Sequence, residues 1–435
     1  MKLSGSGAEK TSQPTPVPWG NVTLSSPTRP FSRDVVLGAF IPAFIFSTGV
    51  GAILPIIAPY SVERGASLAV AGVIAAMLPV GQILADLPAG QLAAKIGDRP
   101  AMLVAGSVAA LGFLAAALAP SVITLAAAVL LVGASNAVFH LARHSYLTEV
   151  TPALHRATVL STLGGVHRIG QFVGPFLGAG VIHFFDTRAV FFIAVVTALA
   201  ATVTVWLARP TKSTGASTEA ASVAEPLTRP RFWAVLNQHR RMLLTLGTVG
   251  MLVGAIRGAR QQVIPLWGEY IDLDPSTISV LFGLAAGIDM LLFYPAGKVM
   301  DALGRLWVGV PAMTMLGIAM ALFPLTSTAG GLAVVAMLLG FANGWGSGIM
   351  MTISSDVAPP ESRPQFLGAW RLLTDLGLGA GPLVLSAGAA LGSLAAGVWA
   401  ASVIGPLAAA GMQRWLPRYS DHANRSTRRR AGLID

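Results

Sequence analysis

Long apolar blocks, separated by short polar turns, run through this sequence from about residue 35 to residue 413. Many blocks reach the length of about 20 residues that a helix needs to cross the hydrocarbon core of a bilayer. Hydrophobic residues make up 54% of the chain and charged residues only 11%, whereas a soluble domain carries about 25% charged residues. So few charges cannot cover a water-exposed surface of this size. The pattern therefore predicts an all-α integral membrane protein.

The apolar blocks predict twelve transmembrane helices, six on each side of a polar central segment. The first six are expected near 35–59, 68–94, 101–119, 122–147, 157–184 and 189–208. The second six are expected near 242–268, 276–300, 306–327, 331–355, 365–388 and 392–413. This assignment divides the chain into a disordered tail at 1–33, a first half at 34–208, a central loop at 209–241, a second half at 242–413 and a basic tail at 414–435.

Lysine and arginine are distributed unevenly between the two sides of the predicted protein. Of the 29 basic residues, 22 lie in the two tails and in the loops at 95–100, 148–156, 209–241, 298–305 and 356–363. Loops rich in lysine and arginine stay in the cytoplasm. Both termini and the central loop are therefore expected on the cytoplasmic side of a cell membrane (inner or plasma membrane). The formal charge of +10 then reflects topology, and no nucleic-acid partner is expected.

A set of residues in the first half recurs in the second half at a constant separation of 207 positions. The recurring residues include Gly97 with Gly304, Asn136 with Asn343, Arg156 with Arg363, Gly170 with Gly377 and Gly174 with Gly381. So many matches at one offset, with no gap, indicate two homologous six-helix halves. In transporters built from such repeats, the solute site lies near the midplane between the halves.

The turns after the second and eighth predicted helices resemble a signature of the major facilitator superfamily, roughly G-x-L-A-D-R-x-G-R-R. The first copy runs from Gly90 to Arg99 and the second begins at Gly297. Ala94 replaces the signature aspartate in the first copy, and Asp86 is a candidate for the missing carboxylate. The resemblance implies the fold of that superfamily, with two pseudo-symmetric halves that alternate access to a central site. It also implies a conformational latch at the cytoplasmic ends of the helices, for which the candidates are Asp86, Gly90, Gly97, Asp98, Arg99, Arg156, Gly297, Asp301, Gly304, Arg305 and Arg363.

The fifth predicted helix carries a second, narrower resemblance. It is similar to the antiporter signature G-x-x-x-G-P-x-x-G-G, through Gly170, Gly174, Pro175 and Gly178. Within the superfamily this signature marks exporters, including the twelve-span drug:proton antiporters. Ala179 replaces the last glycine, and Val129 stands where that family has an arginine deep in the fourth helix. The same glycines could instead serve only as a close-packing face between membrane helices.

Ionisable residues inside the apolar blocks are the candidates for function, because a charge near the middle of the bilayer is costly and seldom kept without a role. Asp289 and Asp375 are the candidates for proton coupling, since burial favours the protonated form of a carboxylate. Five arginines against two deep carboxylates suggest a net-positive cavity, which favours an anionic or amphipathic acidic solute. The candidates for solute binding are Arg168, Arg257, Arg260, His167, Asn136 and Asn343. The alternative reading is two internal ion pairs without a transport role, Arg371–Asp375 and Arg257–Asp289.

Several classes of function are disfavoured by the sequence. It has no cysteine and no phosphate-binding loop of the G-x-x-x-x-G-K-[ST] type, so we expect neither thiol chemistry nor nucleotide hydrolysis. No enzyme activity, metal or cofactor is expected. The prediction is a monomeric secondary active transporter that couples protons to the export of a small amphipathic or anionic solute. The alternatives are an organic-anion or metabolite importer or exchanger of the same superfamily, a passive channel, and a receptor built on a transporter fold.

Reporter fusions test this topology. A fusion within 212–225 or after residue 415 should be cytoplasmic, and one near Ser67 or Pro275 should be external, because loops rich in basic residues are retained in the cytoplasm. Alkaline phosphatase, which is active only outside the cytoplasm, provides the measurement. An external central loop would contradict the orientation and the placement of the latch.

Overall fold

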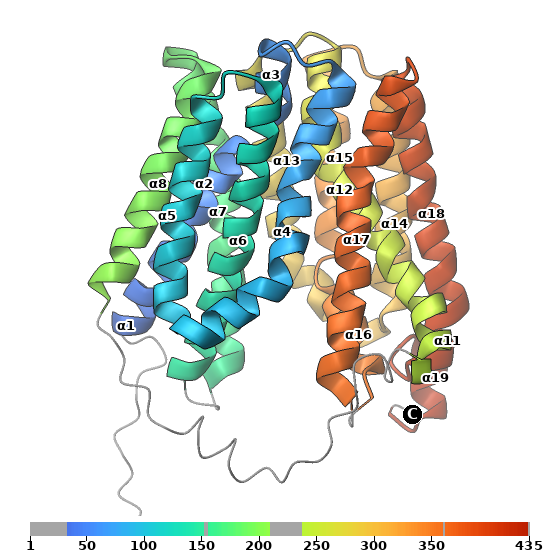
Figure 1. Ribbon diagram of the computed structural model, residues 1–435. Helices are drawn as coiled ribbons and strands as arrows, with labels where there is room; N and C mark the ends of the chain where they lie inside the picture. Colours follow the sequence, from blue (N-terminus) through green and yellow to red (C-terminus); the bar gives the residue numbers. More distant parts are fainter. Residues whose placement is uncertain (1–32, 152–154, 209–236, 360–361, 434–435) are drawn as a thin grey trace, which may run out of the picture.

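The computed structural model describes residues 33–151, 155–208, 237–359 and 362–433 (Figure 1). The predicted N-terminal tail and most of the predicted central loop lie outside these residues. Within them the secondary structure is helical throughout, with no strand. The expected fold class is therefore confirmed.

The first half of the chain folds into one broken helix and five long helices. The broken helix comprises α1 (Arg33–Val35), the π-helical turn η1 (Val36–Phe40), α2 (Ile41–Ile53) and α3 (Ile57–Glu63). The long helices are α4 (Leu68–Ile96), α5 (Asp98–Ala117), α6 (Val122–Val150), α7 (Arg156–Phe184) and α8 (Thr187–Leu207).

The second half repeats this order. It begins with α11 (Arg240–Met242) and the π-helical turn η3 (Leu243–Gly247), which lead into α12 (Thr248–Tyr270). Then follow α13 (Pro275–Leu303), α14 (Leu306–Leu322), the 3-10 turn η4 (Phe323–Leu325), α15 (Ala329–Trp345), α16 (Ile349–Val357), α17 (Arg363–Ala390) and α18 (Leu394–Tyr419). A short helix, α19 (Arg425–Arg430), lies near the end of the chain.

The helix boundaries support the duplication. A shift of 207 residues carries both bounds of α4 onto those of α13, and it carries the first residue of α7 onto that of α17. The same shift carries α6 onto α15 and α16 together. The second copy of this helix is broken at 346–348, where Gly348 has a φ of 78°. The single span expected near 331–355 is therefore two helices, because this glycine takes a conformation that ends α-helical geometry.

Eleven of the described helical segments are long and apolar enough to cross a membrane. The twelfth expected span corresponds to α7, which has 29 residues. The middle of α7 carries His167, Arg168 and Gln171, and these residues lower its mean hydropathy. Their side chains are tolerated because this part of α7 faces the other half of the molecule, where polar groups can find partners.

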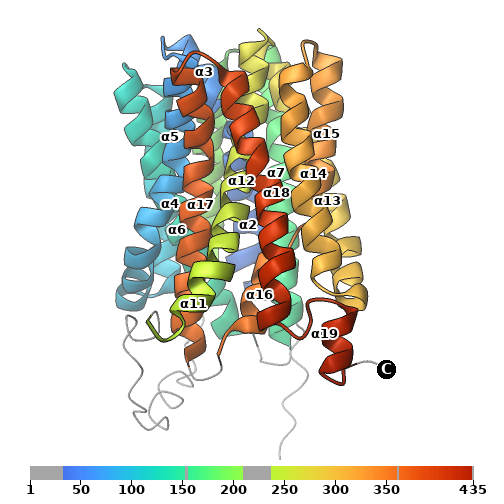
Figure 2. The ribbon, with the colours of Figure 1, turned by 90° about the vertical axis from the view of Figure 1, so that its right-hand side faces the viewer.

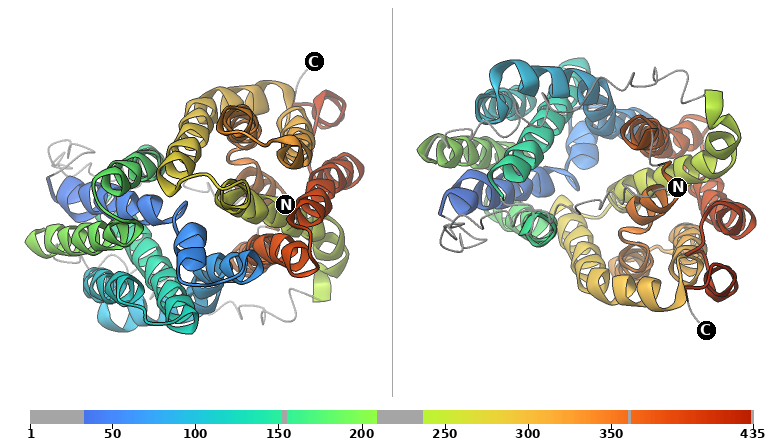
Figure 3. Two further views of the ribbon diagram at one scale, coloured as in Figure 1. Left: turned by 90° about the horizontal axis from the view of Figure 1, so that it is seen from above. Right: turned by 90° about the horizontal axis from the view of Figure 1, so that it is seen from below.

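The long helices run roughly parallel and form two groups side by side (Figures 1, 2 and 3). We call the end with Arg33 and Tyr419 the lower end, and the end with Ser67 and Ser393 the upper end. The two halves meet mainly along two helix pairs, α4 with α17 and α7 with α13. Because these pairs are related by the repeat, the seam between the halves has approximate two-fold symmetry.

Local sequence explains where the helices begin and end. At the upper end, polar side chains accept hydrogen bonds from the first turns of α4, α8, α13 and α18, namely Ser67, Asp186, Asp274 and Ser393. At the lower end, α4 and α13 both stop at a glycine with positive φ, 91° at Gly97 and 106° at Gly304. Such backbone angles favour glycine, so both copies of the repeated signature form the expected tight turn.

The glycines of the antiporter-like segment lie in a helix–helix contact within the first half. A Cβ at Gly170 would lie 2.7 Å from the carbonyl oxygen of Phe44 in α2, and one at Gly174 would clash with that of Thr48. Their repeats, Gly377 and Gly381, pack in the same way against α12. Small residues let membrane helices approach this closely. The segment therefore has a packing role that is common to both halves.

Glycine-to-alanine substitutions test this packing. Gly174→Ala should lower the free energy of unfolding by about 1–3 kcal/mol, because the added methyl group forces α7 and α2 apart. Gly180→Ala is the matched control on the same helix, since a Cβ there meets no atom within 4 Å. Thermal unfolding of the purified variants provides the measurement. Equal midpoints for the two variants would show that the close contact does not limit stability.

Candidate functional site

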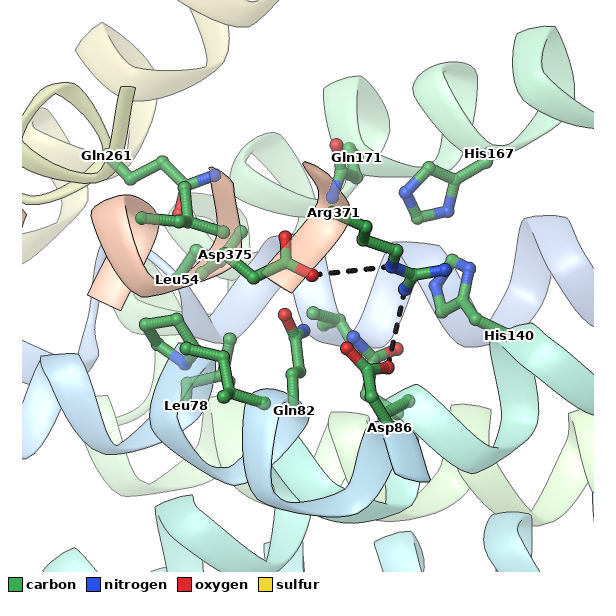
Figure 4. Close-up of a pocket in the computed structure, with 16 residues that line it drawn as sticks. Leu54, Leu78, Gln82, Asp86, His140, His167, Gln171, Gln261, Arg371 and Asp375 are labelled. Atoms are coloured by element: carbon green, nitrogen blue, oxygen red, sulfur yellow. Dashed lines mark hydrogen bonds and ion pairs between the residues drawn. The ribbon is translucent and has the colours of Figure 1, made fainter. Parts of the chain in front are cut away.

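A cavity of about 280 Å³ lies between the two halves, near the middle of the helices. Helices α2, α4, α6 and α7 of the first half and α12 and α17 of the second half line it (Figure 4). Its polar lining consists of Gln82, Asp86, Asn136, His140, His167, Gln171, Gln261, Arg371 and Asp375. A smaller adjoining cavity of about 60 Å³ shares Gln171 and Gln261 with it and reaches Arg168, Arg260 and Asp289. The cavity lies between the halves, where the sequence predicts the solute site.

The halves are in contact above the cavity and separated below it. Above it, Ser276 of α13 donates a hydrogen bond to the carbonyl of Ala179 in α7 at 3.3 Å. On its lower side, the ion pair between Asp86 and Arg371 is open to solvent, and the side chain of Asp86 is 28% exposed. The side chain of Arg371 is 64% exposed. The cavity therefore opens toward the lower end.

Arg371 of α17 is shared by two carboxylates from opposite halves (Figure 4). Its Nη2 lies 3.3 Å from Oδ1 of Asp86 in α4, and its Nε lies 3.3 Å from Oδ2 of Asp375, one turn further along α17. The ion pair of Arg371 with Asp375, which the alternative reading of the sequence included, is present. Asp86, expected at the latch, instead forms an ion pair across the seam. Two negative charges thus share one positive charge in a place that solvent reaches.

Asp289 of α13 is surrounded by donors. Its Oδ2 accepts hydrogen bonds from Nη2 of Arg260 at 2.9 Å and from Nδ2 of Asn343 at 2.8 Å. Its Oδ1 accepts from the hydroxyl of Ser347 at 3.4 Å and lies 3.6 Å from Nη1 of Arg168. Two arginines and two neutral donors therefore compensate this carboxylate within the protein.

The ion pair of Arg257 with Asp289, which was the other half of the alternative reading, is not formed within the described residues. Nη2 of Arg257 donates to the carbonyl of Gly346 at 2.6 Å, at the break between α15 and α16. A helix end leaves carbonyl groups without intrahelical partners, and the buried arginine satisfies one of them. Arg260, three residues further along α12, takes the place beside Asp289. Arg257 thus lies behind the wall of the two cavities, which weakens its case as a solute contact.

Two histidines form the wall of the cavity where α6 faces α7. The rings of His140 and His167 are nearly perpendicular, with centroids 4.6 Å apart, and Ser47 of α2 forms a hydrogen bond with Nδ1 of His167. Nη2 of Arg143 lies 2.9 Å from Nδ1 of His140. Arg143 is only 2% exposed, and no carboxylate in the described part of the chain forms an ion pair with it.

The balance of charge along the cavities differs from the expectation. Three arginines and three aspartates line them, namely Arg168, Arg260, Arg371, Asp86, Asp289 and Asp375. The prediction of a net-positive lining was wrong because it left out Asp86 and counted Arg143 and Arg257, which do not line either cavity. Arg143 is buried behind the lining, and Arg257 is partly buried there.

The arginines of the predicted latch contact their own half in this structure. Arg99 donates to two carbonyl groups at the end of α8, at 3.2 and 2.7 Å. Arg305 pairs with Asp356 at 2.9 Å and with Asp301 at 3.5 Å. The lower ends of the halves are apart here, so a contact between these groups across the seam stays a prediction.

Two further latch candidates, Asp98 and Arg363, also interact within their own half. Asp98 interacts with Ser145 of α6, and Arg363 donates to Ser355. The side chain of Arg156 lies outside the described part. The signature glycines Gly90 and Gly297 do not pack closely in this structure: a Cβ would lie 3.7 Å from Leu141 at the first and near no other atom at the second.

Sequence reasoning missed three amides of the cavity. Gln82, Gln171 and Gln261 all line it. Each lies inside an apolar block, where a glutamine is costly without a partner. A glutamine in the middle of an apolar block is thus a usable signal for a polar cavity, as the ionisable residues and Asn136 are. Of the two asparagines proposed for solute binding, Asn136 lines the cavity whereas Asn343 is bound to Asp289.

Comparisons with known proteins match this architecture. A family model described as the Major Facilitator Superfamily matches residues 39–382 and also 249–433. The nucleoside transporter NupG is similar with 14% identity over 88% of this chain and 100% of that chain, at a TM-score of 0.71. A D-xylose-proton symporter matches with 14% identity over 89% and 98% of the two chains, at 0.65. The human organic anion transporter MFSD10 (TETRAN) matches with 18% identity over 87% and 99%, at 0.60.

At these identities the solved structures show a shared fold alone. No curated protein matches the chain.

The network around Asp289 predicts a strong effect on stability. Asp289→Asn should lower the free energy of unfolding by roughly 3–5 kcal/mol, because it leaves largely buried arginines without their counter-ion. Asp421→Asn, at an exposed carboxylate outside the cavity, should change it by less than about 0.5 kcal/mol. Thermal unfolding followed by tryptophan fluorescence compares the two. An unchanged midpoint for Asp289→Asn would mean that Asp289 does not hold this network together.

Proposed function

The chain belongs to the major facilitator superfamily, and we propose that it is a secondary active transporter that exports a small amphipathic or anionic solute in exchange for protons. The solute binds in the cavity between the halves, and rocking of the halves exposes the cavity to one side of the membrane at a time. The observation that carries the proton-coupling part of this proposal is the sharing of Arg371 by Asp86 and Asp375 across the seam.

The shared arginine suggests how a proton is coupled to the movement. Asp86 and Asp375 are close enough to interact with each other, and only one guanidinium compensates them. Two negative charges that share one positive charge repel each other, and taking up one proton removes this repulsion. When the halves separate above and close below, the geometry of this pair changes, because its members belong to different halves. The proton taken up on one side is then released on the other.

Asp289 is less suited to carry the proton than its position in an apolar block suggests. It interacts with Arg168 and Arg260 and with two neutral donors. Its protonation would leave two arginines without a counter-ion in a poorly solvated place. We therefore assign proton coupling to Asp375 together with Asp86, and we assign Asp289 the role of holding the two arginines at the smaller cavity.

The orientation of the protein in the membrane is inferred from the charge of the loops. Basic residues gather at the lower end, which the positive-inside rule assigns to the cytoplasm. In that orientation the cavity of the described state is open to the cytoplasm and can take up a solute there. The turns at Gly97 and Gly304, with their neighbours Arg99 and Arg305, are the elements that would meet when the lower end closes.

An importer or exchanger of organic anions or metabolites is the second candidate. The organic anion transporter with a similar structure shares only the fold with this chain, so it does not decide between the two directions. The same cavity and the same carboxylate pair can work in reverse, because a coupled carrier follows the combined gradients of its ligands. Deletion of the gene distinguishes the two: loss of an exporter raises the solute concentration inside the cell, and loss of an importer lowers it.

Asp86→Asn and Asp375→Asn test the coupling. In proteoliposomes loaded with a pH-sensitive dye, solutes from a panel of organic acids should move protons through the wild-type protein. Either variant should reduce this solute-dependent proton movement by about tenfold or more, since an amide cannot exchange a proton. Asp421→Asn, outside the cavity, should behave like the wild type.

Solute exchange without a pH gradient should survive in both cavity variants, because binding and rocking do not need the proton to be released. Undiminished proton movement in both variants would remove this pair as the coupling site.

A further inference from the structure

The second half contains a small cradle that holds a carboxylate. Asn343 donates to Oδ2 of Asp289 at 2.8 Å, and Ser347, four residues later, donates to Oδ1 at 3.4 Å. The cradle is thus formed by α15 and the turn that follows it, and the carboxylate comes from the neighbouring α13. All three residues lie where two helices of one half pack together.

The repeat places equivalent residues in the first half, but without the carboxylate. A shift of 207 residues relates Asn343 to Asn136, Ser347 to His140, and Asp289 to Gln82. All three first-half residues line the main cavity. Asn136 is buried, and no described residue donates a hydrogen bond to its Oδ1. The first half therefore keeps the asparagine of the cradle, has a histidine in place of the serine, and has a neutral amide in place of the acid.

The first-half cradle also has an extra positive charge behind it. Arg143 donates to His140 at 2.9 Å, and its Nε and Nη1 have no hydrogen-bond partner among the described residues. The equivalent residue of the second half is Met350, which is buried as well. The fold thus accepts an apolar side chain at this position. A buried cation without a counter-ion is costly, so stability of the fold does not explain why an arginine is here.

The arginine determines which way His140 donates. A guanidinium can only donate hydrogen bonds, so Nδ1 of His140 is the acceptor. The hydrogen of the neutral imidazole is then on Nε2, and His140 presents a donor to a ligand. The charged or titratable groups that act on His140 are all basic, namely Arg143, His144, His167 and Arg371. In Figure 4 the guanidinium of Arg371 lies next to His140.

We propose that this cradle, formed by Asn136 and His140 and charged by Arg143, binds a carboxylate group of the transported solute. The solute carboxylate binds beside Gln82 and accepts hydrogen bonds from Asn136 and His140, as Asp289 does from Asn343 and Ser347 in the second half. It supplies the counter-ion that Arg143 lacks. This inference rests on the proposed function in one respect, that the cavity holds the solute, and it narrows the solute class to small carboxylic acids. It also moves anion recognition from Arg257 and Arg260 to the first half.

Equilibrium binding to the purified protein tests the proposal. The probes are benzoate, salicylate and hexanoate, each compared with its uncharged amide by thermal shift and by quenching of tryptophan fluorescence. At least one acid should bind the wild-type protein about tenfold more tightly than its amide, as a hydrogen bond to a charged group provides. Arg143→Met and His140→Leu should lose this preference, whereas His140→Gln, which keeps an N–H donor, should retain most of it.

A variant that carries its own carboxylate in the cradle completes the test. Gln82→Asp places a carboxylate where the repeat has Asp289, so it should fill the cradle, raise the thermal midpoint and abolish the preference for acids. The proposal is overturned if no acid binds more tightly than its amide, if Arg143→Met keeps the full preference, or if Gln82→Asp binds acids as the wild type does. No proton gradient is involved, so a failure of proton coupling leaves this result unaffected, and a failure here leaves coupling through Asp86 and Asp375 standing.

Discussion

A charge inside a membrane protein needs a partner, and this requirement organises the interior of the chain. The described charges meet it to three different degrees. Asp289 is fully compensated by two arginines and two neutral donors, and it stabilises the second half. Arg371 is shared by two carboxylates from opposite halves, which leaves a place for a proton. Arg143 is buried without a carboxylate, which leaves a place for an anion. On this account, the degree to which a charge is paired decides its role: a fully paired charge stabilises the fold, a shared charge couples protons, and an unpaired charge binds the solute.

The duplication of the chain explains why these different sites lie in two halves with the same helix packing. Both halves pack their glycine-bearing helix against the first helix of the half, through Gly174 in one and Gly381 in the other. In both halves the equivalent helices α4 and α13 end at a glycine with positive φ. The two halves share this packing but differ at the cavity, where Gln82 of the first half is the repeat equivalent of Asp289 in the second half. An internal comparison of the halves therefore separates residues that build the fold from residues that serve the solute.

The sequence was sufficient for the fold and insufficient for the contacts. Hydrophobic length and the constant offset of 207 residues predicted the helices and the halves, because both follow from the local chain and the bilayer. The break after Trp345 was missed, and with it the role of Arg257, since a carbonyl freed at 346 leaves no mark in composition. Asp86 was assigned to the latch because its distance from the turn is short in sequence. Its partner Arg371 comes from the other half, and spacing within one half cannot predict that contact.

The central claim is that the two halves open at one end while they close at the other. Distances between spin labels test it directly, and the absence of cysteine from the chain makes selective labelling simple. One pair of labels at Ser161 and Lys298 reports on the lower ends of α7 and α13, and another at Phe184 and Tyr270 reports on the upper end. The account predicts that acidification, or Asp86→Asn, changes the two distances in opposite directions. Two distances that stay fixed, or that lengthen and shorten together, would contradict alternating access in this protein.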